Sequence, residues 1–333
     1  MFNQKNNGPP HLKRCGLKQA LVFRLFKRPH LKRCGFTFEN KKRFSKRGIA
    51  LPFNWIFAII VGTVILFLAL YAVSQFVSTS QNIGSTETSA KLVGIFEGVG
   101  GIGDEKIEIE FREESRVEFS CDELSNRPFG LQRVRYGEGL DISIKDKYIF
   151  SEGVVEGKKL NVFSKPFYLG YKVSDLVIVS NDNYCFVDAP LEIKEELSSL
   201  GLSNVKFDDS ECEGIDVCFS GGCDIVVDNN VIRKDGKRMI YVDNLIFAGI
   251  FSSPEIYECN VKRLVSRFKE LALIYEEKVS LIEDRGCKSN LDVKLSIIRD
   301  FDVESSADLI LFNDMVGEVN EINKIQPEGC EVW

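Results

Sequence analysis

The residues best suited to metal or redox chemistry are ten cysteines and two histidines, and they form two groups along the 333-residue chain. In the first group, residues 10–16 (PHLKRCG) return unchanged as residues 29–35, so each copy places a histidine four residues before a cysteine. That spacing puts each His and Cys on one face of a helix. Four zinc ligands would result: His11, Cys15, His30 and Cys34. A short duplication in a polar segment explains the repeat without any metal. We favour that interpretation and predict no metal or cofactor.

The second group consists of eight cysteines that all follow residue 120. An even number of cysteines in an exported region predicts up to four disulfide bonds, whose pairing the sequence does not give. Three of them cluster at spacings of x5 and x4 rather than C-x2-C, which favours disulfides over a metal–thiolate site. The disulfide candidates are Cys121, Cys185, Cys212, Cys218, Cys223, Cys259, Cys287 and Cys330.

No histidine occurs after His30, which excludes Ser-His-Asp and Cys-His nucleophilic catalysis from the rest of the chain. Carboxylates remain, and one acidic stretch could supply oxygen ligands to calcium: Asp208, Asp209, Glu211, Glu213 and Asp216. The stretch lacks the D-x-[DN]-x-[DN]-G pattern of a calcium loop, so we interpret it as a solvated loop. Asp and Glu are too numerous for a catalytic pair to stand out, and we predict no catalytic residue.

A glycine-rich string, Gly98–Gly103, matches the G-x-G-x-x-G pattern of dinucleotide-binding proteins. That pattern works only between a strand and a helix, where the helix N-terminus receives the pyrophosphate. Here the residues that follow, 107–111 (IEIEF), alternate with a period of two and predict a strand. We therefore predict a flexible loop and no nucleotide cofactor.

The segment that must position all these groups is an apolar run over residues 49–77, which lies within a stretch free of charge between Arg47 and Glu87. About 20 apolar residues suffice to cross a hydrocarbon core of roughly 30 Å, whereas the apolar part of a cleaved signal peptide has about 7–15. The run predicts one uncleaved transmembrane helix.

Charge predicts the orientation of this helix. Residues 1–48 hold 14 Lys/Arg and one acid, whereas residues 49–333 hold 29 Lys/Arg and 48 Asp/Glu. Basic flanks stay on the cytoplasmic side, so we predict a cytoplasmic N-terminus, a single pass through the cell membrane and a C-terminal region outside. A basic tail beside a membrane is attracted to anionic headgroups, which makes membrane lipid the expected partner of residues 1–48 and nucleic acid an unlikely one.

The remaining sequence predicts an α+β extracytoplasmic region. Residues 78–105, rich in Ser, Thr, Asn and Gly, predict a flexible linker, and recurrent strand patterns with one helix over 190–200 predict a β-rich domain over 106–250. Asp235-Gly236 predicts the turn of a hairpin over 231–242.

Residues 251–333 predict an antiparallel helical unit. Ser253 is a good N-cap and Pro254 a good first residue for a helix that stops at Gly286. An apolar stripe with steps of three and four follows, and we expect it to pack against its own domain, although such a stripe can also pair chains. Further helices are predicted over 291–299 and 307–322, and a single reversal between them would bring Cys330 towards Cys287.

Three segments carry a resemblance to known proteins. They are residues 46–60 (KRGIALPFNWIFAII), residues 252–264 (SSPEIYECNVKRL) and the terminal Cys-x-x-Trp. Over residues 45–333 the chain resembles a family of uncharacterised single-span membrane proteins of small-genome archaea, and this resemblance implies no activity. Lys46-Arg47-Gly48 before an apolar helix is also similar to archaeal type IV pilin signals, which are cut after the glycine position. Those signals carry Glu at the fifth residue beyond the cut, where this chain has Phe53.

These features favour a non-enzymatic, membrane-anchored envelope protein whose extracytoplasmic region binds a protein partner or has a structural role. A pilin-like surface subunit is the first alternative. A membrane-tethered hydrolase that uses two carboxylates is the second, and it requires two acids facing each other across a cleft, about 5–10 Å apart.

Overall fold

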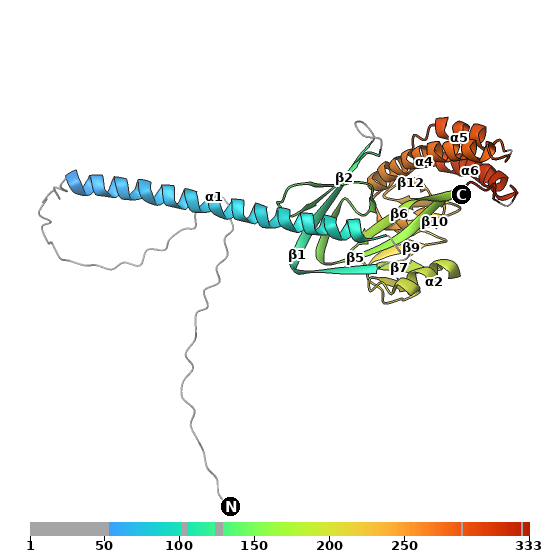
Figure 1. The fold of residues 1–333 in the computed structure, drawn as a ribbon. Coiled ribbons are helices and arrows are strands. Elements are labelled where there is room, and N and C mark those ends of the chain that lie inside the picture. The colour runs from blue at the N-terminus through green and yellow to red at the C-terminus, as the bar shows by residue number, and fades with distance from the viewer. Residues whose placement is uncertain (1–52, 101–105, 124–128, 288, 328) are drawn as a thin grey trace, which may run out of the picture. The chain divides into compact units, whose positions relative to one another are not determined.

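The computed structural model describes residues 53–100, 106–123, 129–287, 289–327 and 329–333. Within these residues the protein is α+β, with two mixed six-stranded sheets, six α-helices and one short 3-10 helix (Figure 1). The α+β class predicted from the sequence is therefore confirmed. The four zinc candidates of the tail, His11, Cys15, His30 and Cys34, lie outside the described residues.

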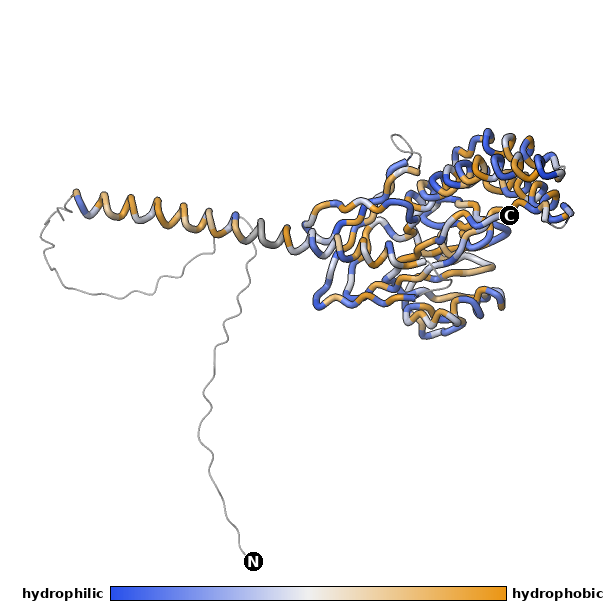
Figure 2. The backbone as a smooth tube through the Cα atoms, viewed as in Figure 1, coloured by the Kyte–Doolittle hydropathy of each residue, from blue (hydrophilic) through white to orange (hydrophobic). Residues whose placement is uncertain are grey.

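Helix α1 runs from Phe53 to Gly98. Its first half, Phe53–Phe76, is mainly apolar (Figure 2), and none of its residues is buried. At 1.5 Å per residue these 24 residues extend about 36 Å, enough to cross a bilayer core. In the described part of the chain this is the one helix long and apolar enough to span a membrane.

The second half of α1 corrects the predicted linker over 78–105. That prediction is wrong for residues 83–98, which are helical and pack against a sheet. Leu92, Val93 and Phe96 are buried on one helical face, and Val99 continues that face beyond the helix end. Ser89 is also buried, and its hydroxyl accepts a hydrogen bond from the sheet. The polar composition that predicted a linker therefore belongs to a helix that docks partly through hydroxyl groups.

The first sheet, sheet A, receives this half-helix. Its strands lie in the order β3-β2-β1-β5-β6-β4, antiparallel except for the parallel pair β4–β6. The strands are β1 (Lys106–Asp122), β2 (Leu131–Tyr136), β3 (Ile142–Ile144), β4 (Tyr148–Phe150), β5 (Val154–Leu169) and β6 (Tyr171–Ser180). Val117, Phe119 and Val134 belong to the same buried cluster as the helix residues, so α1 closes one core against sheet A.

The second sheet, sheet B, has the order β12-β11-β10-β9-β7-β8, parallel from β10 to β8 and antiparallel from β10 to β12. Its strands are β7 (Tyr184–Val187), β8 (Val205–Phe207), β9 (Ile215–Cys218), β10 (Ile225–Asp228), β11 (Val231–Lys234) and β12 (Lys237–Ile240). Asp235 and Gly236 have φ of 52° and 71° in the turn between β11 and β12, as the hairpin prediction required. Helix α2 (Leu191–Leu200) follows β7, within the residues predicted for it.

Four helices and the 3-10 turn complete the chain: α3 (Leu245–Phe251), α4 (Pro254–Glu283), α5 (Leu291–Asp300), η1 (Ser306–Asp308) and α6 (Leu309–Lys324). The Ser253 side chain caps α4 by accepting from the backbone N–H of Ile256, with Pro254 in the first turn. Helices α4 and α5 thus form as predicted, and α6 begins slightly later than predicted because η1 precedes it. Helix α3 was not predicted from the sequence, because its seven residues are all buried and show no amphipathic period.

The larger core joins the predicted β-rich and helical parts. One cluster of buried residues includes Phe163 of β5, Phe186 of β7, Phe251 of α3 and Phe312 of α6. The apolar stripe of α4, exemplified by Phe268, lies in the same cluster. The stripe therefore packs inside its own chain, as expected, and the sheets and helices share a core. We refer to residues 83–333 as the head.

Candidate functional site

The eight cysteines of the head form four disulfide bonds in the structure. The bonds are Cys121–Cys259, Cys185–Cys212, Cys218–Cys223 and Cys287–Cys330. The last bond is the pairing expected from the helical arrangement, and it joins the end of α4 to the C-terminal residues. All eight disulfide candidates are therefore used as structural bonds, which leaves no thiol for catalysis in the described chain.

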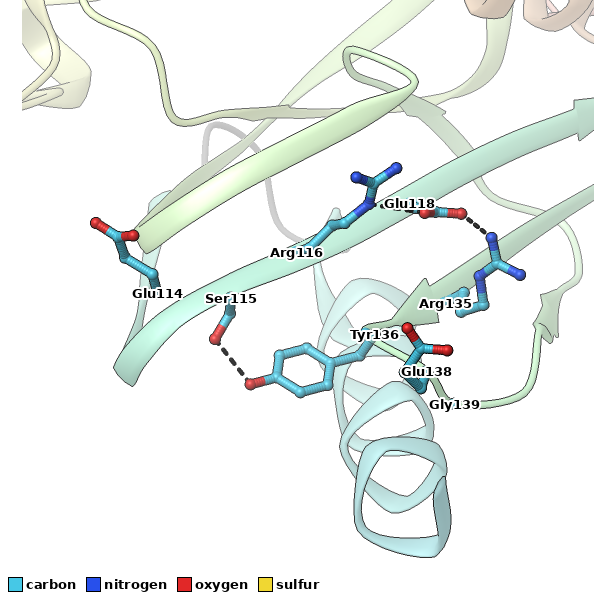
Figure 3. Close-up of a pocket in the computed structure, with 9 residues that line it drawn as sticks. Glu114, Ser115, Arg116, Glu118, Arg135, Tyr136, Glu138 and Gly139 are labelled. Carbon is cyan, nitrogen blue, oxygen red and sulfur yellow. Dashed lines mark hydrogen bonds and ion pairs between the residues drawn. The ribbon is translucent and has the colours of Figure 1, made fainter. Parts of the chain in front are cut away.

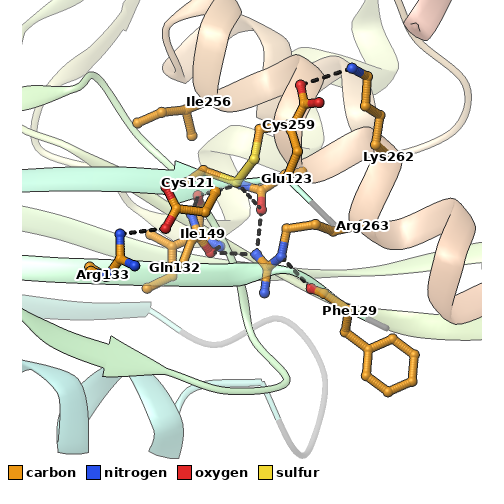
Figure 4. The surroundings of a disulfide bond; sticks show 12 residues. Cys121, Glu123, Phe129, Gln132, Arg133, Ile149, Ile256, Cys259, Lys262 and Arg263 are labelled. Atoms are coloured by element: carbon orange, nitrogen blue, oxygen red, sulfur yellow. Dashed lines mark hydrogen bonds and ion pairs between the residues drawn. A yellow bond between two sulfur atoms is a disulfide. The ribbon is translucent and has the colours of Figure 1, made fainter. Parts of the chain in front are cut away.

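The disulfide Cys121–Cys259 ties β1 to α4 beside a buried arginine (Figure 4). Arg263 is fully buried, and its guanidinium donates to the carbonyl of Phe129 at 2.7 Å, to Gln132 Oε1 at 3.0 Å and to Asn260 Oδ1 at 2.7 Å. All three acceptors are neutral.

Burial lowers the pKa of Arg263, and the charge of Asp146 opposes this effect only in part, because no carboxylate binds the guanidinium directly. Its charge is instead shared among oxygen dipoles and the ring of Tyr148, 4.8 Å from the guanidinium carbon. Gln132 also pairs with the backbone of Ile149 in both directions, at 2.5 and 2.7 Å. The cluster is closed to solvent and joins β1, β2, β4 and α4. We interpret it as a structural junction.

The acidic stretch proposed as a calcium candidate does not converge on a shared point. Asp208 binds Lys194 at 2.6 Å and accepts from the backbone N–H of Asp188, and Asp209 binds Lys206 at 3.2 Å. The Lys194 contact lowers the pKa of Asp208, and the backbone N–H of Glu211, which donates to Asp209, lowers the pKa of Asp209. Within the described residues no group of three His, Cys, Asp or Glu is placed to hold a metal ion.

The glycine-rich string also lacks the context of a nucleotide site. Gly98 is the last residue of α1, so the described beginning of the string follows a helix rather than a strand. Gly101 to Gly103 lie outside the described residues.

A polar hollow lies where β1 bends and β2 ends, beside α1 (Figure 3). This charged hollow has a volume of about 570 Å³. Its lining residues are Glu114, Ser115, Arg116, Glu118, Arg135, Tyr136, Gly137, Glu138 and Gly139. The register of β1 against β5 shifts between Glu110 and Ser115, and this irregularity opens the hollow on the β1 side.

Helix α1 forms the support of the charged hollow on the β2 side. The backbone N–H of Tyr136 donates to Ser89 Oγ at 2.9 Å, and that of Leu140 donates to Thr86 Oγ1 at 3.0 Å. A Cβ atom at Gly139 would lie 2.8 Å from the α1 backbone at Ser85 and Thr86. The turn after β2 can therefore approach α1 only with glycine at position 139.

An ion-pair ladder crosses the charged hollow. Arg116 binds Glu118 at 2.8 Å and Glu156 at 3.1 Å, and Arg135 binds the second oxygen of Glu118. The Arg135 contact holds the pKa of the Glu118 carboxyl below its usual range, and Glu118 in turn raises the pKa of Arg135. The Nε of Arg135 is buried without a hydrogen-bond partner, with Asp141 3.8 Å away.

The hydroxyl groups in the charged hollow are not arranged for nucleophilic catalysis. Ser115 Oγ lies 2.7 Å from the Tyr136 hydroxyl and donates to the carbonyl of Glu113. An attacking hydroxyl needs a neighbouring base, whereas these hydroxyls bond to each other and to the backbone. The arrangement suits recognition of a polar ligand by charge and hydrogen bonds.

The carboxylate-hydrolase alternative receives no support from the acids whose pKa is displaced. A glycosidase needs one carboxyl with a raised pKa as general acid. Glu118, Asp208 and Asp209 have lowered pKa values, as described, and the pKa of Glu108 falls to about 2 because Lys106 and Lys159 both bind it. Wherever the pKa of a carboxyl group is shifted in the described residues, it is lowered by a basic side chain or a backbone N–H group.

The charged hollow was not predicted from the sequence. Arg116 and Glu118 lie two residues apart on β1 and Arg135 lies on β2, so they share one sheet face only because Glu118 pairs with Arg135 in the register. The alternation of charged with apolar residues in 116–119 and 133–136 is the one signal that could have suggested a charged sheet face.

Comparisons of the chain with protein-family profiles, with curated proteins and with solved structures found no match.

Proposed function

We propose that the protein is a membrane-anchored envelope protein whose disulfide-tied head binds a partner on the outer side of the membrane. The main support for this proposal is that the two halves of α1 differ in their surroundings. One half is mainly apolar and exposed, which in water would be unstable, and the other half is part of the core of the head. Four disulfides in the head support an oxidising compartment, and the basic residues before α1 support a cytoplasmic N-terminus.

A binding role rather than catalysis is supported by the chemistry of the head. The charged hollow offers arginines, carboxylates and hydroxyls in fixed hydrogen bonds, without a nucleophile–base pair. Within the head, the second half of α1 is fixed to sheet A by apolar packing and hydrogen bonds. Along α1 only about nine residues, or about 14 Å, separate Phe76 from Ser85, which lies against Gly139 of the head, and this short helical distance supports a binding surface near the membrane.

Protease protection tests this function. Cells that carry the full chain with an epitope at each end are converted to spheroplasts and treated with protease after reduction of disulfides. We expect loss of the C-terminal epitope and survival of the N-terminal one. Survival of the C-terminal epitope with loss of the N-terminal one would overturn the proposed orientation.

A pilin-like subunit is a second candidate, favoured by the same division of α1. An apolar helix of 24 residues can be surrounded by helices of other copies as well as by lipid, while the second half of α1 carries the head on an antiparallel region of sheet A. N-terminal sequencing of the mature protein tests this candidate. A mature chain that begins at Ile49 would support it, and one that retains Lys46-Arg47-Gly48 would refute it.

A further inference from the structure

Two adjoining hollows of about 500 and 310 Å³ lie along the exposed face of α4, and they share Asp146, Arg267 and Leu271. Neither hollow includes a residue of the charged hollow. The larger hollow, which we call the α4 groove, is further lined by Phe129, Glu270, Leu273, Ile274 and Glu277.

The floor of the α4 groove is apolar although it faces solvent. Ile274 is 60% exposed and Leu273 is 38% exposed, and Leu271 and Phe129 are half-buried. Leu271 and Ile274 are three positions apart and so lie on one helical face. The neighbouring face of α4 packs into the core through Phe268. Exposed apolar side chains grouped in a groove are typical of a surface that another chain covers.

The rim of the α4 groove carries unneutralised negative charge. Among the described residues, Asp146, Glu270 and Glu277 form no ion pair. The one cation of this groove, Arg267, donates its Nε to a backbone carbonyl, that of Val173, at 2.9 Å. Three carboxylates therefore border an apolar floor with a single guanidinium among them.

We propose that the α4 groove binds a basic amphipathic helix of a partner protein, an inference that deepens the proposed binding function and rests on it. Apolar residues of such a helix, spaced three and four apart, fill the groove around Ile274, as in other helix-in-groove complexes. Its Lys and Arg side chains then reach Glu270, Glu277 and Asp146. A second copy of the head is a poor occupant, because residues 49–333 hold 48 acids against 29 bases and the two acidic surfaces repel.

The test uses the full chain in nanodiscs of zwitterionic lipid and a helical peptide of Leu and Lys, with leucines at steps of three and four and one photoreactive leucine analogue. Empty nanodiscs give the binding of the peptide to lipid, which is subtracted. We expect cross-links to map to α4 between Arg267 and Leu281. The double variant Glu270→Gln/Glu277→Gln should weaken binding roughly tenfold, since two charge contacts are lost.

The matched control changes two acids outside the groove. Glu192 and Glu195 lie three residues apart on α2, near Leu191, which is 69% exposed, so Glu192→Gln/Glu195→Gln changes the net charge by the same amount beside another exposed apolar side chain. We expect unchanged peptide affinity and cross-links. Equal weakening in both double variants, or cross-links outside α4, would overturn the proposal. Self-association of the chain that Ile274→Ser abolishes would overturn it in favour of a second copy.

The outcome is separable from that of the proposed function. Peptide binding is measured on the purified chain, so it does not depend on which side of the membrane the head occupies. A head found in the cytoplasm with an intact α4 groove refutes the envelope role alone, whereas a correctly placed head without groove binding refutes this inference alone.

Discussion

The substitution Phe96→Ala tests whether the second half of α1 packs against sheet A. The alternative is the flexible linker that the composition of residues 78–105 suggests. Phe96 is fully buried in the smaller core, and its ring centroid lies 5.9 Å from that of Phe119 on β1. In the variant Phe96→Ala the ring is lost from the centre of the contact between α1 and sheet A. The other buried helix residues, Leu92 and Val93, remain to hold the helix in place.

The expected loss in the free energy of unfolding follows from the complete burial of Phe96. Burial of a Phe side chain contributes about 1.5–3 kcal/mol, and Phe→Ala in a core costs about 3–5 kcal/mol because a cavity adds to the lost transfer energy. We expect about 3 kcal/mol, the lower end, because a single helix on a sheet can settle towards the cavity. This is a large fraction of the roughly 5–15 kcal/mol that stabilises a typical domain.

The assay is urea unfolding of the full chain in detergent, followed by the fluorescence of Trp333, which packs against Tyr171 and Tyr275 in the larger core. Ile83→Ala is the matched control, since Ile83 is on the same helix and 64% exposed. We expect this control to lower the free energy of unfolding by less than about 0.5 kcal/mol. Equal, small effects of Phe96→Ala and Ile83→Ala on the free energy of unfolding would refute the docking of α1.

Three further predictions concern the stability of the head. The carboxylate of Glu108, whose pKa is lowered from 4.5 to about 2, stabilises the fold above pH 4.5 and loses that effect as the pH falls to about 2, so the difference in melting temperature between wild type and Glu108→Gln should vanish over this range. Loss of the Cys287–Cys330 bond in a double Ser variant should cost about 4 kcal/mol in urea unfolding, from the entropy of a 43-residue separation. Gly139→Ala should lower the melting temperature, because its Cβ would meet the backbone of α1 at 2.8 Å.

Each of these predictions has an outcome that contradicts it. A difference between wild type and Glu108→Gln that stays constant from pH 6 to about pH 2 would show that the lysine contacts do not lower its pKa. A double Ser variant as stable as the oxidised protein would show that the Cys287–Cys330 bond does not constrain the unfolded chain. For Gly139, the control is Gly153→Ala, where a Cβ would meet nothing within 4 Å. Equal melting temperatures of the two alanine variants would show that Gly139 is not in close contact with the backbone of α1.

Features encoded by neighbouring residues were predictable. The Ser253-Pro254 start of α4 and the Asp235-Gly236 turn depend on hydrogen bonds and φ values within four residues. The apolar stripe of α4 recurs along most of a 30-residue helix, so single exceptions do not hide its period. The Cys287–Cys330 pair followed from the order of the helices, because a reversal of direction brings their ends together.

Features set by long-range contacts were not predictable. Residues 83–91 have a loop-like composition, and their helix is stabilised by sheet A, which is encoded further along the chain. The Cys121–Cys259 bond joins residues 138 positions apart, and no spacing in the sequence selects that pair. The charged hollow likewise depends on the register that places Glu118 opposite Arg135, a register that hydrophobic packing on the opposite sheet face determines.

The central claim, a disulfide-bonded head outside the membrane and a basic tail inside, is tested most directly by the labelling of all ten cysteines in one experiment. Sealed right-side-out vesicles with the full chain are treated with a membrane-impermeant maleimide, before and after an impermeant phosphine reductant, and labelled sites are mapped by peptide mass. We predict that the eight head cysteines are labelled only after reduction, and that Cys15 and Cys34 are labelled only after detergent opens the vesicles. Labelling of Cys15 and Cys34 in sealed vesicles, or of the head cysteines without reduction, would contradict the account.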